Sequence, residues 1–172
     1  MYVYLSKKIT VQNNTFITAS SWNRKQGYVA AGTESGLIKV IKLEVSEGKD
    51  PKARDAKSSN TTNLLMNASL EGHTSQISCI AWNDVYNKLT TADTNGRIVI
   101  WNCHRNEWTE EMVNKRDMIV VTSMKWSADG EHICIVYNDG VIIMGSVEGN
   151  RIWVKDLKNT ALTNIEVKIY YF

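Results

Sequence analysis

Several patterns are missing from this chain of 172 residues, and each absence argues against a class of protein. No apolar run approaches the roughly 18 consecutive residues of a membrane span. The apolar N-terminal stretch is too short, and too soon followed by Lys7 and Lys8, for a secretory signal peptide. Three widely spaced cysteines, Cys79, Cys103 and Cys134, favour reduced thiols over a disulfide framework. We therefore expect a protein of the cytoplasm without a membrane segment.

The chain also lacks a large excess of charge of either sign, and it lacks known catalytic motifs. Lys and Arg total 20, Asp and Glu total 18, and the two signs interleave, so no basic stripe can neutralise nucleic-acid phosphates. The chain has no nucleophile elbow, phosphate-binding loop, HExxH or Cys-x-x-Cys motif, and its carboxylates are scattered over turn positions. We expect no enzyme activity, no catalytic residues, no cofactor, no metal site and no nucleic-acid partner.

What the chain does contain is an internal repeat anchored on three tryptophans, each followed by a glycine at one fixed spacing. The pairs are Trp22 and Gly36, Trp82 and Gly96, and Trp126 and Gly140. Short apolar runs lie on both sides of each glycine, and Asn, Asp and Gly residues typical of hairpin turns separate them. The common register predicts three copies of one unit of short antiparallel strands, with the tryptophans in its core.

The second copy predicts strands most clearly, at Ile77–Trp82, Lys88–Thr91 and Arg97–Asn102. A fourth, outer strand is expected in each copy, at Leu64–Leu70, Glu107–Val113 and Arg151–Leu157. Four antiparallel strands make one blade of a β-propeller. The sequence therefore predicts an all-β chain with blade 1 over about residues 11–70, blade 2 over about 71–114, blade 3 over about 118–158, and the start of a fourth blade over about 161–172.

Three blades are too few for a closed ring, since propellers have about 4–8 blades. We expect the chain to be the N-terminal part of a longer propeller. On this interpretation Val3–Ile9 is an outer strand of the last blade, and residues 162–165 enter the first strand of the fourth.

One insertion lengthens the first copy, over residues 44–63. It is polar, mixed in charge and contains the only proline, which is typical of a surface loop. It is either a tolerated insertion or a binding arm.

The second copy resembles the WD repeat, because Gly72-His73 precede its first strand and Trp101 ends its third. In that family a His, a Ser/Thr, an Asp and the Trp form a buried hydrogen-bond chain that braces the blade. The resemblance places these roles on His73, Thr91, Asn95 and Trp101, with Asn95 replacing the acid. A metal or catalytic role for the histidine is the alternative, but metal sites need several converging ligands, so we expect a structural role.

More specific stretches carry a closer resemblance. Among them are residues 4–9, 69–73, 108–112 and, most distinctively, 145–158 with its Gly-Asn-Arg-Ile-Trp run. Together they resemble the N-terminal propeller of a WD-repeat subunit of intraflagellar transport complex A, the WD repeat-containing protein thirty-five family. The resemblance covers about residues 1–168 and departs from the family in the 44–63 insertion.

The resemblance implies a non-catalytic scaffold acting in retrograde intraciliary transport, cargo import and cilium assembly. Its implied partners are other intraflagellar transport complex A subunits and ciliary membrane-protein cargo. The implied location is the cilium, its axoneme and base, and the cytoplasm and cytoskeleton. The alternative is a generic WD-repeat interaction module outside cilia, such as a ubiquitin-ligase substrate receptor or a tubby-like or vesicle-coat relative.

Overall fold

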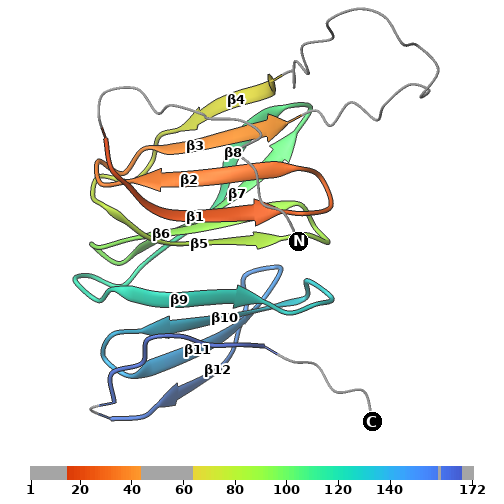
Figure 1. Ribbon diagram of the computed structural model, residues 1–172. Helices are drawn as coiled ribbons and strands as arrows, with labels where there is room; N and C mark the ends of the chain where they lie inside the picture. Colours follow the sequence, from red (N-terminus) through yellow and green to blue (C-terminus); the bar gives the residue numbers. More distant parts are fainter. Residues whose placement is uncertain (1–14, 44–63, 159, 168–172) are drawn as a thin grey trace, which may run out of the picture.

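The computed structural model describes residues 15–43, 64–158 and 160–167, and within them every regular element is a β-strand. None of the described segments forms a helix with the length and hydrophobicity required to cross a membrane. Figure 1 shows the strands gathered into three sheets that follow one another along an arc. The predicted all-β class is confirmed.

Each sheet contains four antiparallel strands in sequence order. Blade 1 consists of β1 (Ile17–Asn23), β2 (Tyr28–Thr33), β3 (Ile38–Leu43) and β4 (Leu64–Leu70). Blade 2 consists of β5 (Ile77–Asn83), β6 (Lys88–Asp93), β7 (Arg97–His104) and β8 (Glu107–Lys115). Blade 3 consists of β9 (Val121–Trp126), β10 (His132–Tyr137), β11 (Val141–Ser146) and β12 (Arg151–Asp156). Every strand predicted in the three copies of the repeat is present, with ends that differ by a few residues.

The first strand of each blade lies at the inside of the arc. β5 packs against β1 on one side and against β9 on the other, so the inner strands connect the blades (Figure 1). Two apolar clusters fill the spaces between them. One joins blades 1 and 2 through residues such as Ile38, Leu70 and Trp101, and the other joins blades 2 and 3 through residues such as Ile98 and Val121.

The three repeat glycines occupy one equivalent turn between the second and third strands. Gly36, Gly96 and Gly140 have φ angles of 88°, 80° and 86°, and each donates its N–H to the residue three positions earlier. A β-carbon at Gly36 would lie 2.7 Å from the carbonyl oxygen of His73, and one at Gly96 would overlap the carbonyl of Arg116. The turn therefore needs glycine for its backbone angle and because the chain entering the next blade passes directly over it.

The fourth blade is where the structure differs from the expected strands. Residues 160–167 form no strand, although the sequence predicts that residues 162–165 begin one. Asn164 accepts a hydrogen bond from Ser123 on β9, and the Ile165 N–H is bonded to the Asn164 side chain. A first strand needs a second strand beside it to complete the ladder, and the described residues contain none. The segments Val3–Ile9 and 44–63 lie outside the described residues.

Candidate functional site

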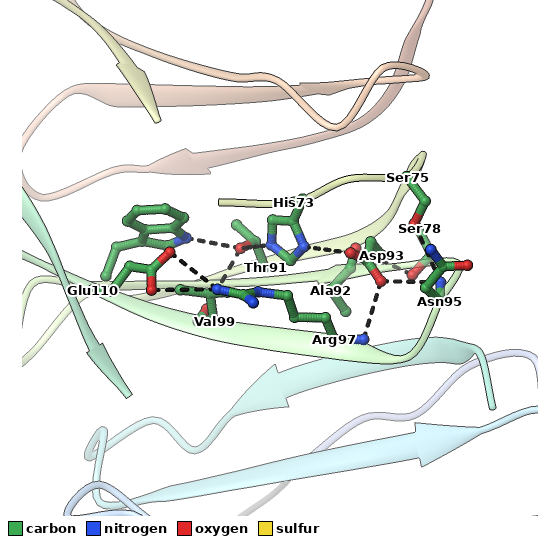
Figure 2. Close-up of polar contacts among 11 residues, drawn as sticks. His73, Ser75, Ser78, Thr91, Ala92, Asp93, Asn95, Arg97, Val99 and Glu110 are labelled. Atoms are coloured by element: carbon green, nitrogen blue, oxygen red, sulfur yellow. Dashed lines mark hydrogen bonds and ion pairs between the residues drawn. The ribbon is translucent and has the colours of Figure 1, made fainter. Parts of the chain in front are cut away.

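A buried chain of hydrogen bonds joins β6, β7 and the entry loop of blade 2 (Figure 2). Asp93 Oδ2 lies 2.8 Å from His73 Nδ1, and His73 Nε2 lies 2.8 Å from Thr91 Oγ1. The indole N–H of Trp101 donates to the same threonine oxygen at 2.8 Å. All four side chains are buried. The structure thus brings His73, Thr91 and Trp101 together, as the WD resemblance implied.

The acid of this chain is Asp93, so the assignment of that role to Asn95 is wrong. Thr91 and Asp93 are two residues apart on β6 and so point to the same face, toward His73. Asn95 lies beyond the strand in the turn, where this alternation stops. Its backbone N–H donates to Asp93 Oδ1 at 3.0 Å and lies 3.3 Å from the Ser75 hydroxyl. Side chains two positions apart on a strand share a face, and β6 ends at Asp93, so the alternation counted from Thr91 identifies Asp93 as the partner of His73.

Asp93 has a second role at the same turn. Its Oδ1 accepts the backbone N–H groups of Asn95 and Arg97, both at 3.0 Å. One carboxylate therefore connects the hydrogen-bond chain to the turn between β6 and β7. Arg97 in turn reaches Glu110 on β8 at 3.3 Å, which extends the polar contacts to the outer strand (Figure 2).

His73 is held in its neutral form. Burial lowers its pKa, and the hydrogen bond and charge of Asp93 offset this only in part. A neutral ring that carries its proton on Nδ1 satisfies every partner: it donates to Asp93 and accepts from the Thr91 hydroxyl, which in turn accepts from Trp101. The side chains of His73 and Asp93 are 0% and 1% exposed, so no substrate can reach them. This arrangement braces the blade.

The repeat tryptophans connect neighbouring blades. Trp82, at the end of β5, donates its indole N–H to the carbonyl oxygen of Ser21 in blade 1 at 3.1 Å. Its ring stacks on Tyr28 with centroids 5.8 Å apart, and Trp108 meets both rings edge-on. Trp126 does the same one blade later, donating to the Thr90 hydroxyl of blade 2 at 3.1 Å.

Trp22 differs from its two equivalents. Its side chain is 61% exposed, so the prediction that all three tryptophans are core residues is wrong for this one. The reason is geometric: Trp82 and Trp126 each pack on the preceding blade. No blade precedes blade 1 within the described residues. Among the residues that the structure describes, none therefore packs over the face of blade 1 that carries Trp22 as blade 1 packs over Trp82.

One group of side chains in the described part has metal-ligand composition. Ligand atoms of Asp129, Glu131 and His132 lie within 4.8 Å of one another. Asp129 Oδ1 already accepts the Ser127 hydroxyl and the Glu131 N–H, as the first turn of blade 3 requires. The Ser127 hydroxyl also lowers the pKa of Asp129. This hydrogen-bonded turn explains why the group lies together.

Four-stranded blades in an arc, with a His-Asp-Thr-Trp chain in one of them, define the class of WD-repeat propellers. Solved structures agree. The C-terminal WD40 domain of Sif2 is similar with a TM-score of 0.64 and 22% identity, covering 86% of this chain and 39% of that one. The WD40 repeats of RRP9 are similar with a TM-score of 0.67 and 12% identity, covering 90% and 42%. At these identities the likeness concerns the fold alone.

Within this class, the chain belongs to the WDR35/TULP4 N-terminal propeller family, whose family model matches residues 1–169. It is 50% identical to WD repeat-containing protein 35 of Homo sapiens over 165 residues, which is 96% of this chain and 14% of the relative. It is 32% identical to Tubby-related protein 4 of Homo sapiens over 133 residues, which is 77% of this chain and 8% of the relative. The chain thus spans a small part of the curated relatives that it matches.

Proposed function

We propose that this chain is part of a non-catalytic scaffold of intraflagellar transport complex A, acting in retrograde intraciliary transport, cargo import and cilium assembly. The observation that carries the proposal is its 50% identity to WD repeat-containing protein 35 across 96% of its length. Its proposed partners are the other complex A subunits and ciliary membrane-protein cargo, at the axoneme and the ciliary base.

The geometry supports the non-catalytic part of this proposal. The buried polar cluster around His73 and Asp93 satisfies its own hydrogen bonds and is sealed from solvent. Rigid blades with exposed loops and strand edges favour the binding of proteins instead.

The family model also includes Tubby-related protein 4. The alternative proposal is therefore that this chain is a WD-repeat interaction module with a role outside cilia, as a tubby-like relative. The higher identity to WD repeat-containing protein 35, 50% against 32%, favours the ciliary role.

A domain exchange tests the proposal. Residues 1–168 of this chain replace the matching segment of WD repeat-containing protein 35, and the chimaera is expressed in ciliated cells that lack that protein. The control chimaera carries the matching segment of Tubby-related protein 4. We expect the first chimaera to restore cilia and to co-purify complex A subunits, and the second to do neither. Failure of the first chimaera at matched expression, or equal rescue by both, would contradict the ciliary assignment.

A further inference from the structure

Blade 3 lacks the large side chain that fills the corresponding place in blade 2. Trp101 on β7 pairs with Leu89 on β6, and Gly145 on β11 pairs with Ile133 on β10 at the equivalent position of the repeat. Trp101 is 3% exposed and fills space between blades 1 and 2. In blade 3 the same position has no side chain at all.

A cavity of about 430 Å³ lies between blades 2 and 3, and Gly145 forms part of its wall. This volume falls within the range of ~300–1,000 Å³ typical of ligand pockets. Its walls are mainly aliphatic, from both blades: Ile98, Ile100, Ile133, Ile135, Val141 and Ile143. We call this space the interblade groove.

Polar contacts hold the two blades at a fixed separation at both ends of the interblade groove. At one end Arg116 pairs with Asp139 at 2.7 Å and lies over the Tyr137 ring at 4.6 Å. At the other end the Lys88 ammonium lies 3.3 Å from the carbonyl oxygen of Val147. Because these contacts connect the two blades at both ends of the groove, we expect the groove to keep its width in the folded protein.

The groove opens toward the outer strands, because Met112 and Asn114 of β8 and Arg151, Val154 and Asp156 of β12 also line it. β12 is the last strand of its sheet, and its side chains are exposed along its whole length. A strand at a sheet edge offers unpaired backbone N–H and C=O groups to an extended peptide. The groove and the strand edge therefore form one continuous surface.

The positive charge of Arg151 indicates which kind of extended peptide this surface would bind. Arg151 lines the groove and is the register partner of Gly145, so it stands beside the missing side chain. The ion pairs found in the described part of the chain leave Arg151 without a carboxylate, whereas Arg116 has Asp139. An acidic group on the ligand, close to its apolar anchor, supplies that partner.

We propose that the interblade groove binds an extended peptide, which inserts a large apolar side chain, above all an aromatic one, beside Gly145 and places a carboxylate on Arg151. The inserted side chain takes the space that Trp101 fills in blade 2. The peptide backbone pairs with the free edge of β12. This inference concerns a surface of the chain itself and does not depend on the ciliary role.

A random-peptide display library, selected on the purified 172-residue chain, tests the proposal. We expect the enriched peptides to share a large apolar residue next to Asp or Glu. Gly145→Leu should weaken the enriched peptides by at least about tenfold, because it blocks the pocket of the anchor residue. A β-carbon at Gly145 meets only ordinary contacts, 3.4 Å from Ile133 and 3.5 Å from Asn150. Gly145→Ala is therefore the matched control and should keep binding.

A second pair of variants tests the charge and leaves Gly145 and the aliphatic walls of the groove unchanged. Arg151→Glu should lower affinity by about fivefold. Lys155→Glu, on the same strand but paired with Ile142 on its opposite face, should change affinity by less than about twofold. The proposal is overturned if no peptide family is enriched, if Gly145→Leu melts like wild type and binds equally well, or if Arg151→Glu and Lys155→Glu have the same effect.

Discussion

Replacing Asp93 separates the bracing role found here from the one expected at Asn95. Asp93→Asn keeps the size of the side chain and one oxygen, which can still accept the backbone N–H groups of Asn95 and Arg97. Its amide nitrogen then faces His73 Nδ1, which must give up its proton and become an acceptor. The ring proton moves to Nε2, so the Thr91 hydroxyl has to turn from His73 and accept two donors.

The magnitude follows from the contacts that change. The variant loses a charge-assisted hydrogen bond worth about 1.5–3 kcal/mol. It also leaves the Thr91 hydroxyl with only the Val99 carbonyl oxygen, at 3.5 Å, as an acceptor. We expect the free energy of unfolding to fall by about 2–3 kcal/mol. Asp93→Ala also leaves the backbone N–H groups of Asn95 and Arg97 without their acceptor and should cost about 3–5 kcal/mol.

Asn95→Ala is the matched control. Asn95 makes its hydrogen bonds through its backbone N–H and carbonyl groups, which alanine retains, so the cost should be below about 0.5 kcal/mol. Urea unfolding followed by tryptophan fluorescence gives the free energies, with the dependence on urea checked for constancy. Amide hydrogen exchange in β6 and β7 locates the effect in blade 2. The reasoning is refuted if Asn95→Ala costs as much as Asp93→Asn, or if Asp93→Asn is neutral.

Three further predictions test the blade contacts. Trp82→Ala should lower the free energy of unfolding by about 3–5 kcal/mol, because it leaves a cavity between blades 1 and 2. Trp22→Ala should change that free energy by less than about 0.5 kcal/mol. Equal values from denaturant titrations would contradict the conclusion that Trp82 packs between blades and Trp22 does not. Gly96→Ala should cost at least about 1–3 kcal/mol, since alanine at φ 80° is strained and its β-carbon overlaps the Arg116 carbonyl; an unchanged melting temperature would argue against this turn. Because the pKa of His73 is lowered in the folded chain, the unfolded chain binds a proton that the folded chain does not. The free energy of unfolding should therefore fall as pH drops through about 6.5. A His73→Gln variant whose stability has the same dependence on pH would contradict this prediction.

The local structure could be predicted from the sequence because its causes are local. Alternating apolar residues and turn residues such as Asn95-Gly96 set strand and hairpin positions, and the fixed spacing of Trp82 and Gly96 gives the blade. The same pattern places Thr91 and Trp101 on adjacent strands of one sheet and His73 in the loop before that sheet. The family resemblance was readable for the same reason, since it lies in contiguous stretches of sequence.

Only the tertiary structure decided which side chains meet across strands and blades. The WD resemblance placed the role of the acid on Asn95, and the contact between His73 and Asp93 in the folded blade shows that Asp93 on β6 has this role instead. Trp22 and Trp82 occupy the same repeat position, yet one is open and the other buried, because burial depends on whether a preceding blade lies beside it. In the sequence, Gly145 is only a glycine at the repeat position where the second copy has Trp101. In the folded chain it borders a cavity, because the walls that surround it come from two different blades.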